Sequence, residues 1–236
     1  MLSRFSMVRP TSSATCVYHP NHSGFKFHSE PAGLIVYHNT VVGENNLRHA
    51  FSNAHFRNNL FLRTDAPDTG IAVVANKTPY STYGFNGYRP NRRAVDQYLW
   101  DGKSYASLTE LNKATSQETY GIEVDFDVFE NLQVYDPAKP HTVYHARNLD
   151  FRLRGGGKAV DAGVQLPNVN DDFNHRAPDI GAYGTGKAIP VSGPAGRPGK
   201  CSTSRCSWER RSRRETESLT HFGCRAGETP SDQKSA

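Results

Sequence analysis

The chain has 236 residues, a mean hydropathy of −0.67 and a formal net charge of +5. This length predicts one or two domains, and no stretch approaches the roughly 18 consecutive apolar residues that a membrane helix needs, so we expect no membrane span. The first sixteen residues contain Arg4 and Arg9 but no apolar segment of the kind found in signal peptides.

The positive charge is confined to the C-terminal part of the chain. Residues 1–184 contain 18 Lys and Arg against 18 Asp and Glu, whereas residues 185–236 contain 10 basic and 5 acidic residues. The region after about Ile189 is rich in Ser, Arg, Gly and Pro and has no periodicity, which predicts a disordered basic tail over residues 187–236. Its arginines would attract any polyanion, but we expect no specific nucleic-acid binding.

Residues 1–30 predict a worn or frayed first copy of a pattern that becomes clear after residue 31. Within residues 31–62 a motif repeats after twenty residues: a large apolar residue stands three before an asparagine, and an apolar pair follows. The two copies contain Val36, Asn39, Val41 and Val42, and then Phe56, Asn59, Phe61 and Leu62.

A period near twenty in strand-forming residues is typical of a β-solenoid, in which equivalent positions of successive coils stack. Apolar residues then form a continuous core, and stacked asparagines bond one another. We therefore predict a structural ladder in which Asn39 and Asn59 lie about one strand spacing, roughly 5 Å, apart. The alternative is two ordinary strands that share an asparagine by chance, for which a flat antiparallel sandwich is the natural fold.

Four further elements follow along the chain. Residues 71–74 predict a short buried strand, and Asn86-Gly87, flanked by aromatic residues, predicts a turn. Ser107 followed by Glu110 has the form of a capping box and predicts a helix to about Lys113. Residues 122–129 alternate apolar and acidic residues, which predicts a strand with one buried and one solvated face rather than a calcium site.

Two Asp-x-Gly motifs lie near the end of the folded region. Asp161 precedes Gly163, and Asp179 precedes Gly181. Asp side chains bind backbone N–H groups in tight turns, and glycine adopts positive φ at no steric cost. We interpret these four residues as turn-forming rather than as metal ligands or catalytic carboxylates.

The segments 149–154, 159–163 and 177–183, read as Leu-Asp-Phe-Arg-Leu-Arg, Ala-Val-Asp-Ala-Gly and Ala-Pro-Asp-Ile-Gly-Ala-Tyr, resemble the closing segment of secreted bacterial right-handed parallel β-helix proteins. That superfamily includes pectate-lyase-like and other polysaccharide-degrading enzymes and members of unknown activity. The resemblance covers about residues 30–186.

The resemblance implies an all-β chain: a partial right-handed parallel β-helix, a single-stranded β-solenoid, over residues 31–186, whose closing segment wraps the last coils. It also implies an extracellular or cell-surface location. The chain departs from the family at residues 155–157, where Gly-Gly-Gly replaces Pro-Gly-Ser, and at Gly184, where the family has Glu. Few coils can be read, so the chain looks like the C-terminal piece of a longer protein.

A lyase that acts on uronates must neutralise a carboxylate, remove the neighbouring proton and support the leaving oxygen. Tyr88, Arg89, Arg92 and Arg93 form the best local cluster and are the candidate substrate-binding residues, because arginine binds carboxylates in a bidentate manner and tyrosine rings stack on sugars. The alternative is a solvated loop whose arginines pair with Asp96 and neighbouring acids.

Histidines are the other candidates for chemistry. His38 and His55 fall on the repeat, and His141 and His145 flank Tyr144. We interpret them as hydrogen-bonded outer side chains rather than general bases. The sequence identifies no catalytic residue, no metal site and no cofactor; calcium belongs to the full-length family and has no support in this chain.

Two function hypotheses follow. The first is a fragment of a polysaccharide lyase, or less readily a hydrolase, that acts on extracellular acidic polysaccharide. The second is a non-catalytic β-helix module for adhesion or structure, since this scaffold hosts both kinds of function. In either case we expect a monomer with a polysaccharide as its partner.

Overall fold

The structure is a computed structural model, and it describes residues 15–19, 24–27, 29–44, 47, 50–65, 72–75, 78–94 and 97–186. The chain divides into two units, residues 1–189 and 190–236, and the described residues belong to the first. The predicted disordered tail and Asp96 therefore lie outside the described residues.

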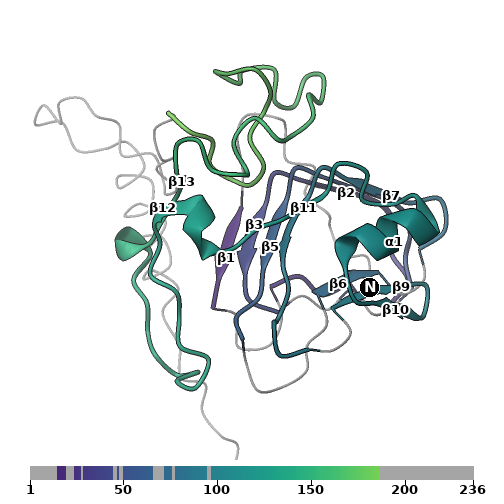
Figure 1. The fold of residues 1–236 in the computed structure, drawn as a ribbon, viewed down its shortest axis with the longest axis horizontal. Helices are drawn as coiled ribbons and strands as arrows, with labels where there is room; N and C mark the ends of the chain where they lie inside the picture. Colours follow the sequence, from purple (N-terminus) through teal and green to yellow (C-terminus); the bar gives the residue numbers. More distant parts are fainter. Residues whose placement is uncertain are drawn as a thin grey trace, which may run out of the picture. The chain divides into compact units, whose positions relative to one another are not determined.

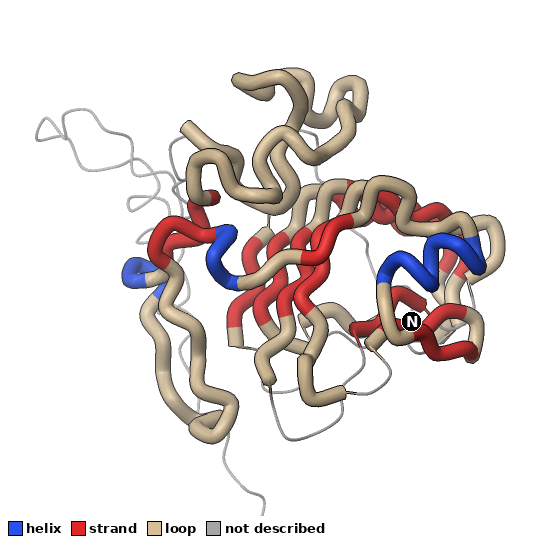
Figure 2. Tube along the Cα trace, in the orientation of Figure 1, coloured by secondary structure: helices blue, strands red, loops and turns tan. Residues whose placement is uncertain are grey.

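The described part is mostly β-structure (Figures 1 and 2). Its strands are β1 (Cys16–Tyr18), β2 (Ala32–Tyr37), β3 (Thr40–Val42), β4 (Ser52–Arg57), β5 (Leu60–Leu62), β6 (Ala72–Ala75), β7 (Thr82–Gly84), β8 (Gly87–Arg89), β9 (Tyr98–Trp100), β10 (Lys103–Tyr105), β11 (Ile122–Glu123), β12 (Phe129–Asn131) and β13 (Asp150–Leu153). Its helices are α1 (Leu108–Thr115) and two 3₁₀ turns, η1 (Phe126–Val128) and η2 (Ala146–Asn148).

Two parallel sheets carry most of the fold. One has the strand order β1-β3-β5-β8-β11, and the other has the order β2-β4-β7. Each sheet receives one strand from each successive segment: β2 and β3, then β4 and β5, then β7 and β8. The described part is mostly β-structure with little helix, which is compatible with the all-β prediction. The alternative of an antiparallel arrangement for the two repeat strands is wrong, because β2 with β4 and β3 with β5 pair in parallel.

The register explains why the sequence repeats. Thr40 pairs with Leu60, Leu60 with Gly87, and Gly87 with Ile122. Equivalent positions are 20 residues apart between the first two copies and 27 apart between the next two. The longer spacing accommodates β6, which lies outside both large sheets and pairs with β9.

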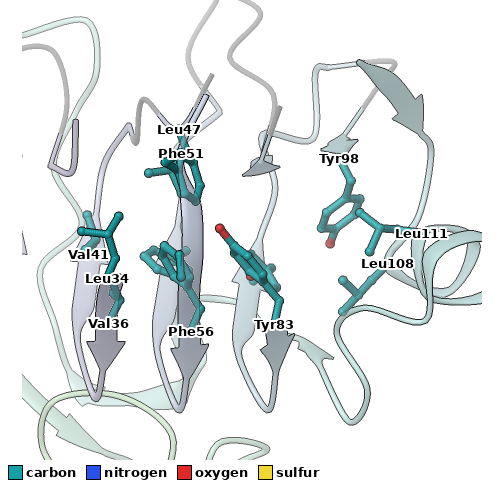
Figure 3. Packing of buried hydrophobic residues seen from close by; sticks show 13 residues of the cluster. Leu34, Val36, Val41, Leu47, Phe51, Phe56, Tyr83, Tyr98, Leu108 and Leu111 are labelled. Carbon is teal, nitrogen blue, oxygen red and sulfur yellow. The ribbon is translucent and has the colours of Figure 1, made fainter. Parts of the chain in front are cut away.

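Apolar side chains from equivalent positions pack on one another between the sheets. Val36, Phe56 and Tyr83 lie in a row across three neighbouring strands (Figure 3). The Phe56 and Tyr83 rings stack with centroids 4.3 Å apart, and those of Phe61 and Tyr88 with centroids 5.6 Å apart. The core is thus a set of parallel apolar rows, which is what a side-chain period of two on stacked strands produces.

The turns that lead from one sheet to the other also stack. His38, Asn58, Phe85 and Tyr120 have φ values of 52°, 58°, 56° and 60°. This left-handed conformation is unusual for residues other than glycine and costs energy at each position. Backbone hydrogen bonds between neighbouring turns, such as Asn58 N–H to Phe85 O at 3.1 Å, hold the bends in place.

The predicted helix is present and is capped as expected. Ser107 Oγ accepts a hydrogen bond from the backbone N–H of Glu110 at 3.2 Å, and α1 continues to Thr115, two residues beyond the prediction. Leu108 and Leu111 are buried and point toward Tyr98 (Figure 3). No helix in the described part of the chain combines the length and apolar character required to cross a bilayer.

The predicted strand over residues 122–129 is wrong for residues 124–128, because β11 ends at Glu123 and the next strand, β12, begins at Phe129. The chain leaves β11, and Asp125 caps η1 by accepting a hydrogen bond from the Phe126 N–H at 2.8 Å. The apolar and acidic alternation therefore reflects a two-residue strand followed by a capped turn. A carboxylate that is engaged locally in this way competes with strand pairing.

Residues 158–186, the later part of the closing segment, are held together by aspartates that bind backbone groups within the same segment. Asp179 Oδ1 accepts from the Asp161 N–H at 2.9 Å, and Asp161 Oδ1 accepts from the Ala177 N–H at 3.1 Å. Gly181 has a φ of +108°, whereas Gly163 has no positive φ, so its predicted conformational reason is wrong. Gly163 is required instead by close approach, since a Cβ there would lie 2.8 Å from Pro178 O.

Candidate functional site

A buried ladder of amide side chains runs along the turns. Asn39 Nδ2 donates to Asn59 Oδ1 at 2.9 Å, and Asn59 Nδ2 donates to Asn86 Oδ1 at 2.9 Å. Each Oδ1 also accepts the backbone N–H of the preceding asparagine, at 3.0 Å in both cases. The structure thus brings Asn39 and Asn59 together and adds Asn86, which the sequence interpretation had placed only in a turn.

The ladder ends on a carboxyl group rather than on a fourth amide. The register puts Gly121 at the next equivalent position, and a Cβ there would lie 3.0 Å from Glu118 Oε2. Glu118 therefore occupies the space of the missing side chain and accepts from Asn86 Nδ2 at 3.0 and 3.2 Å. Tyr88 Oη donates to Glu118 Oε1 at 2.6 Å. All donors of the ladder point one way, so an acceptor is the group its end requires.

Tyr88 cannot bind a sugar, and its prediction as a substrate-binding residue is wrong. Its side chain is 2% exposed and packs between Phe61 and Tyr98. Burial, together with the negative charge of Glu118, raises its pKa well above the usual value. The residue occupies a core position because it is paired with Phe61 of the preceding copy.

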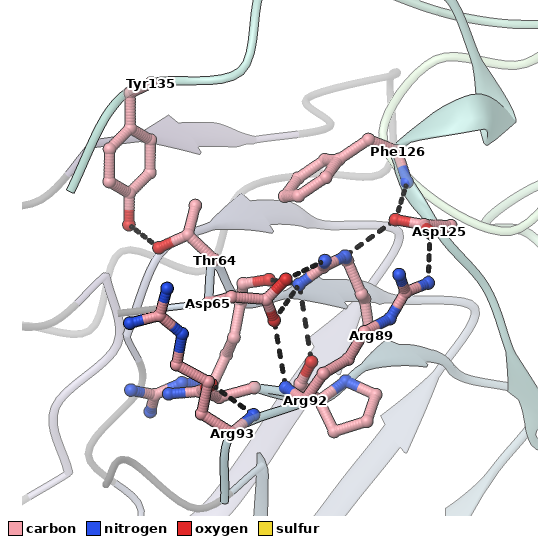
Figure 4. A network of polar contacts seen from close by, with 11 residues as sticks. Thr64, Asp65, Arg89, Arg92, Arg93, Asp125, Phe126 and Tyr135 are labelled. Atoms are coloured by element: carbon pink, nitrogen blue, oxygen red, sulfur yellow. Dashed lines mark hydrogen bonds and ion pairs between the residues drawn. The ribbon is translucent and has the colours of Figure 1, made fainter. Parts of the chain in front are cut away.

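Arg89 is also buried, inside a polar network at the carboxyl ends of β5 and β8 (Figure 4). Its guanidinium lies between two carboxylates: Nη2 donates to Asp65 Oδ2 at 2.8 Å, and Nε donates to Asp125 Oδ1 at 2.7 Å. Arg89 Cζ lies 4.7 Å from the centroid of the Phe126 ring. The hydrogen bond from Arg89 holds the pKa of Asp65 below its usual value. Arg89 therefore acts as a structural cation, and its predicted substrate contact is wrong.

The other two arginines of the predicted cluster differ from Arg89. The side chain of Arg92 is 61% exposed and pairs with Asp125, whereas Arg93 is exposed and uses its backbone N–H to bind Asn91 Oδ1 at 3.0 Å. Arg89 and Arg92 together carry two positive charges, which Asp65 and Asp125 offset. Arg89 and Arg92 thus pair with neighbouring acids, as the alternative interpretation required, whereas Arg93 has no ion-pair partner among the described residues and is the one arginine of this cluster whose charge is not offset there.

The repeat histidines have separate environments. His38 Nδ1 lies 3.2 Å from Gly181 O, and His38 Nε2 lies 3.0 Å from Asn58 Nδ2 and 2.8 Å from Asn170 Nδ2. These contacts fit a neutral ring that carries its hydrogen on Nδ1 and accepts both amides on Nε2. His38 therefore joins the closing segment to the turns. His141 and His145 are exposed on the segment between β12 and β13.

The outer face of the β2-β4-β7 sheet gathers a different set of side chains. Leu34, Val36, Ala54, Phe56 and Tyr83 point inward, so the alternate positions point outward. Ile35 pairs with His55, and His55 with Thr82, while Tyr37 pairs with Arg57, and Arg57 with Gly84. Ile35 is 70% exposed, and the others of this outer row, apart from Gly84, are exposed or half-buried.

Arg57 is held on this face by Thr82. Its Nη1 donates to Phe56 O at 2.8 Å and to Thr82 O at 2.9 Å, and its Nη2 donates to Thr82 Oγ1 at 2.9 Å. His55 Nδ1 lies 2.8 Å from the same Thr82 oxygen. Gly84 lies beside the guanidinium, with a Cβ there 3.9 Å from Arg57 Cζ, and glycine is required because that Cβ would lie 2.9 Å from Thr119 O.

Arg57 remains available to an anion. Within the described residues no carboxylate lies at ion-pair distance from it. Its hydrogen bonds to Phe56 O, Thr82 O and Thr82 Oγ1 use three of its five N–H donors and leave Nε and one Nη2 hydrogen, which form one edge of the guanidinium. Such an edge matches the two oxygens of a carboxylate. Arg57 was missed in the sequence, although the repeat places it at the position of Tyr37.

Within the same described residues, no group of three or more His, Cys, Asp and Glu side chains is arranged to hold a metal ion. Comparison of the chain with protein-family models, with curated proteins and with solved structures gives no match. The chemistry of the site must therefore be argued from its residues.

Proposed function

We propose that residues 31–186 form the C-terminal part of a right-handed parallel β-helix whose outer face over β2, β4 and β7 binds an acidic polysaccharide. Two observations support the fold: successive segments contribute one strand to each of two parallel sheets, and their turns stack in register. Right-handed crossovers are the rule for parallel strands. We propose an extracellular location for the protein because its closing segment resembles that of secreted β-helix proteins.

Arg57 carries the proposed binding function. It is a cation on an outer sheet face, with one guanidinium edge unused and with Tyr37 as its neighbour on the preceding strand. Neighbouring strands lie about 4.8 Å apart, so a sugar carboxylate on Arg57 would place the ring within reach of the phenol. Arg89 has no such unused edge, because its guanidinium is already paired with Asp65 and Asp125.

The test is binding to a uronate polymer such as polygalacturonate or alginate, measured by affinity electrophoresis with neutral dextran as the reference. We expect retardation by the uronate polymers alone and loss of most of it in Arg57→Gln. Arg152→Gln is the matched control, because it removes the same charge from an exposed arginine that pairs with Asp150. Equal retardation of Arg57→Gln and the wild type would rule out the proposed face.

A polysaccharide lyase is the second candidate, favoured by the position of His55. Thr82 Oγ1 contacts both His55 and Arg57, so a carboxylate neutralised by Arg57 would have an imidazole nearby to take the adjacent proton. We expect no turnover, because few coils are present to form a groove. Ultraviolet absorbance from new unsaturated sugar ends, abolished in His55→Ala, would instead establish the lyase.

A further inference from the structure

Glu118 is the one acidic side chain of the described residues that is fully buried away from any cation at ion-pair distance. It is 2% exposed and has three hydrogen-bond contacts, all from uncharged groups: two from Asn86 Nδ2 and one from Tyr88 Oη. A buried carboxylate that is stabilised only by neutral donors is costly, and the cost disappears when it binds a proton.

The groups that face Glu118 from the surrounding strands do not remove this cost. Tyr83, Tyr88 and Tyr98 each have a pKa that burial raises, with the charge of Glu118 as a further cause, so they stay neutral near pH 7. Among the described residues, Arg57 is the positive group whose charge lowers the pKa of Glu118, and it lies beyond ion-pair distance. The carboxyl thus lies among neutral donors at the end of the ladder.

We infer that Glu118 is a pH-sensitive end of the amide ladder: the protonated carboxyl stabilises the stacked turns, and its ionisation loosens them. A protonated carboxyl resembles the amide that the other turns place in this row, since it both donates and accepts. An ionised one brings a buried charge into a row of dipoles. This pH response of Glu118 is separate from the proposed polysaccharide binding and does not depend on that proposal.

The direction of the effect follows from linkage. Burial raises the pKa of Glu118 from 4.5 to about 7, against the opposing hydrogen bonds from Tyr88 and Asn86. A folded-state pKa above the unfolded one contributes stability that is complete below about pH 4.5 and is lost as the pH rises through 7. Between pH 5 and pH 8, this single group should raise the unfolding equilibrium constant on the order of 50-fold.

The test compares urea unfolding of the full chain and of Glu118→Gln at several pH values from 5 to 8. The chain also contains ten histidines that both proteins share, so the informative quantity is the ratio of the unfolding equilibrium constants of the two proteins. We expect the ratio of the wild-type unfolding equilibrium constant to that of Glu118→Gln to rise on the order of 50-fold between pH 5 and pH 8, because the glutamine does not ionise. Glu123→Gln is the matched control: Glu123 also accepts from a buried tyrosine, Tyr98, at 2.9 Å, but is itself exposed.

The inference fails if Glu118→Gln follows the same pH dependence as the wild type, or if Glu123→Gln removes as much of it. A second measurement needs no variant to fold. In the wild type labelled with ¹³C-glutamate, one carboxyl resonance should titrate well above the others, near pH 7. If every glutamate carboxyl titrates in the ordinary acidic range, the inference is wrong.

Discussion

Replacement of Asn59 by alanine tests the ladder most directly. Asn59 is fully buried and takes part in four side-chain hydrogen bonds: it accepts from the backbone and side-chain nitrogens of Asn39 and donates to Val36 O and Asn86 Oδ1. The hydrogen bond from the backbone N–H of residue 59 to Asn86 Oδ1 does not involve the side chain and is retained in the variant. The substitution therefore removes the Asn59 partner of three groups: the two hydrogens of the half-buried Asn39, and Val36 O.

Each unsatisfied buried group costs about 1–3 kcal/mol, and water that enters the small cavity recovers part of this, so we expect a loss of roughly 3–5 kcal/mol. A domain has only about 5–15 kcal/mol in total. The assay is equilibrium unfolding in urea, followed by circular dichroism. Asn131→Ala, at an exposed position of β12, is the control and should change stability by less than about 0.5 kcal/mol. A loss below about 1 kcal/mol for Asn59→Ala would refute the ladder as a source of stability.

Three further predictions concern other parts of the chain. Arg89→Met should cost about 2–3 kcal/mol, because it removes the cation that pairs with the partly exposed Asp65 and leaves Asp125 with Arg92 as its ion-pair partner. Asp65 has a lowered pKa only in the folded state, so its contribution is lost as the pH falls below about 4; acid titration of Arg89→Met should show less of this loss. Asn58→Ala should raise hydrogen exchange across residues 158–186 and spare the β3-β5-β8 strands, because Asn58 binds both Val164 N and Val164 O. Deletion of residues 190–236 should leave the melting temperature within about a degree, since that composition buries little apolar surface.

The part of the fold that the sequence could predict is the part that repeats at a constant interval. Asn39 and Asn59 are 20 residues apart, and their contact follows from that spacing. Asn86 belongs to the same row, but it is 27 residues beyond Asn59, so a search at one period does not find it. The signal was nevertheless present: Tyr83 stands three before Asn86, as Phe56 stands three before Asn59.

The candidate site was harder to predict because it depends on that third copy. With Asn86 in the ladder, Tyr88 falls on the core position of Phe61, and Arg89 falls at the strand end where acids from two other segments converge. Tyr88 and Arg89 are therefore neighbours in the sequence, but Tyr88 lies in the apolar core and Arg89 lies between two carboxylates. Glu118 could not have been found by register at all, because it fills the ladder from a position three residues before Gly121.

At Gly184 the family resemblance and the local geometry lead to different expectations for a glutamate side chain. The resembled family has Glu at this position, so the resemblance predicts that a carboxylate side chain is tolerated here. Here a Cβ at residue 184 would lie 3.2 Å from Asp179 Oδ2, the oxygen that accepts from the N–H and hydroxyl of Thr185. A glutamate side chain at residue 184 would therefore have its Cβ next to the Asp179 carboxylate, and its own carboxylate would lie close to a like charge.

We expect Gly184→Glu to be less stable than Gly184→Gln by about 0.5–1 kcal/mol at pH 7, because the two differ only in charge. The difference should shrink in 0.5 M salt, where exposed charges about 4–5 Å apart are screened. Gly184→Ala measures the steric part alone, since Asp179 need shift by only a few tenths of an ångström. If Gly184→Glu equals or exceeds Gly184→Gln in stability at low salt, the charge of Asp179 does not determine which side chains residue 184 tolerates.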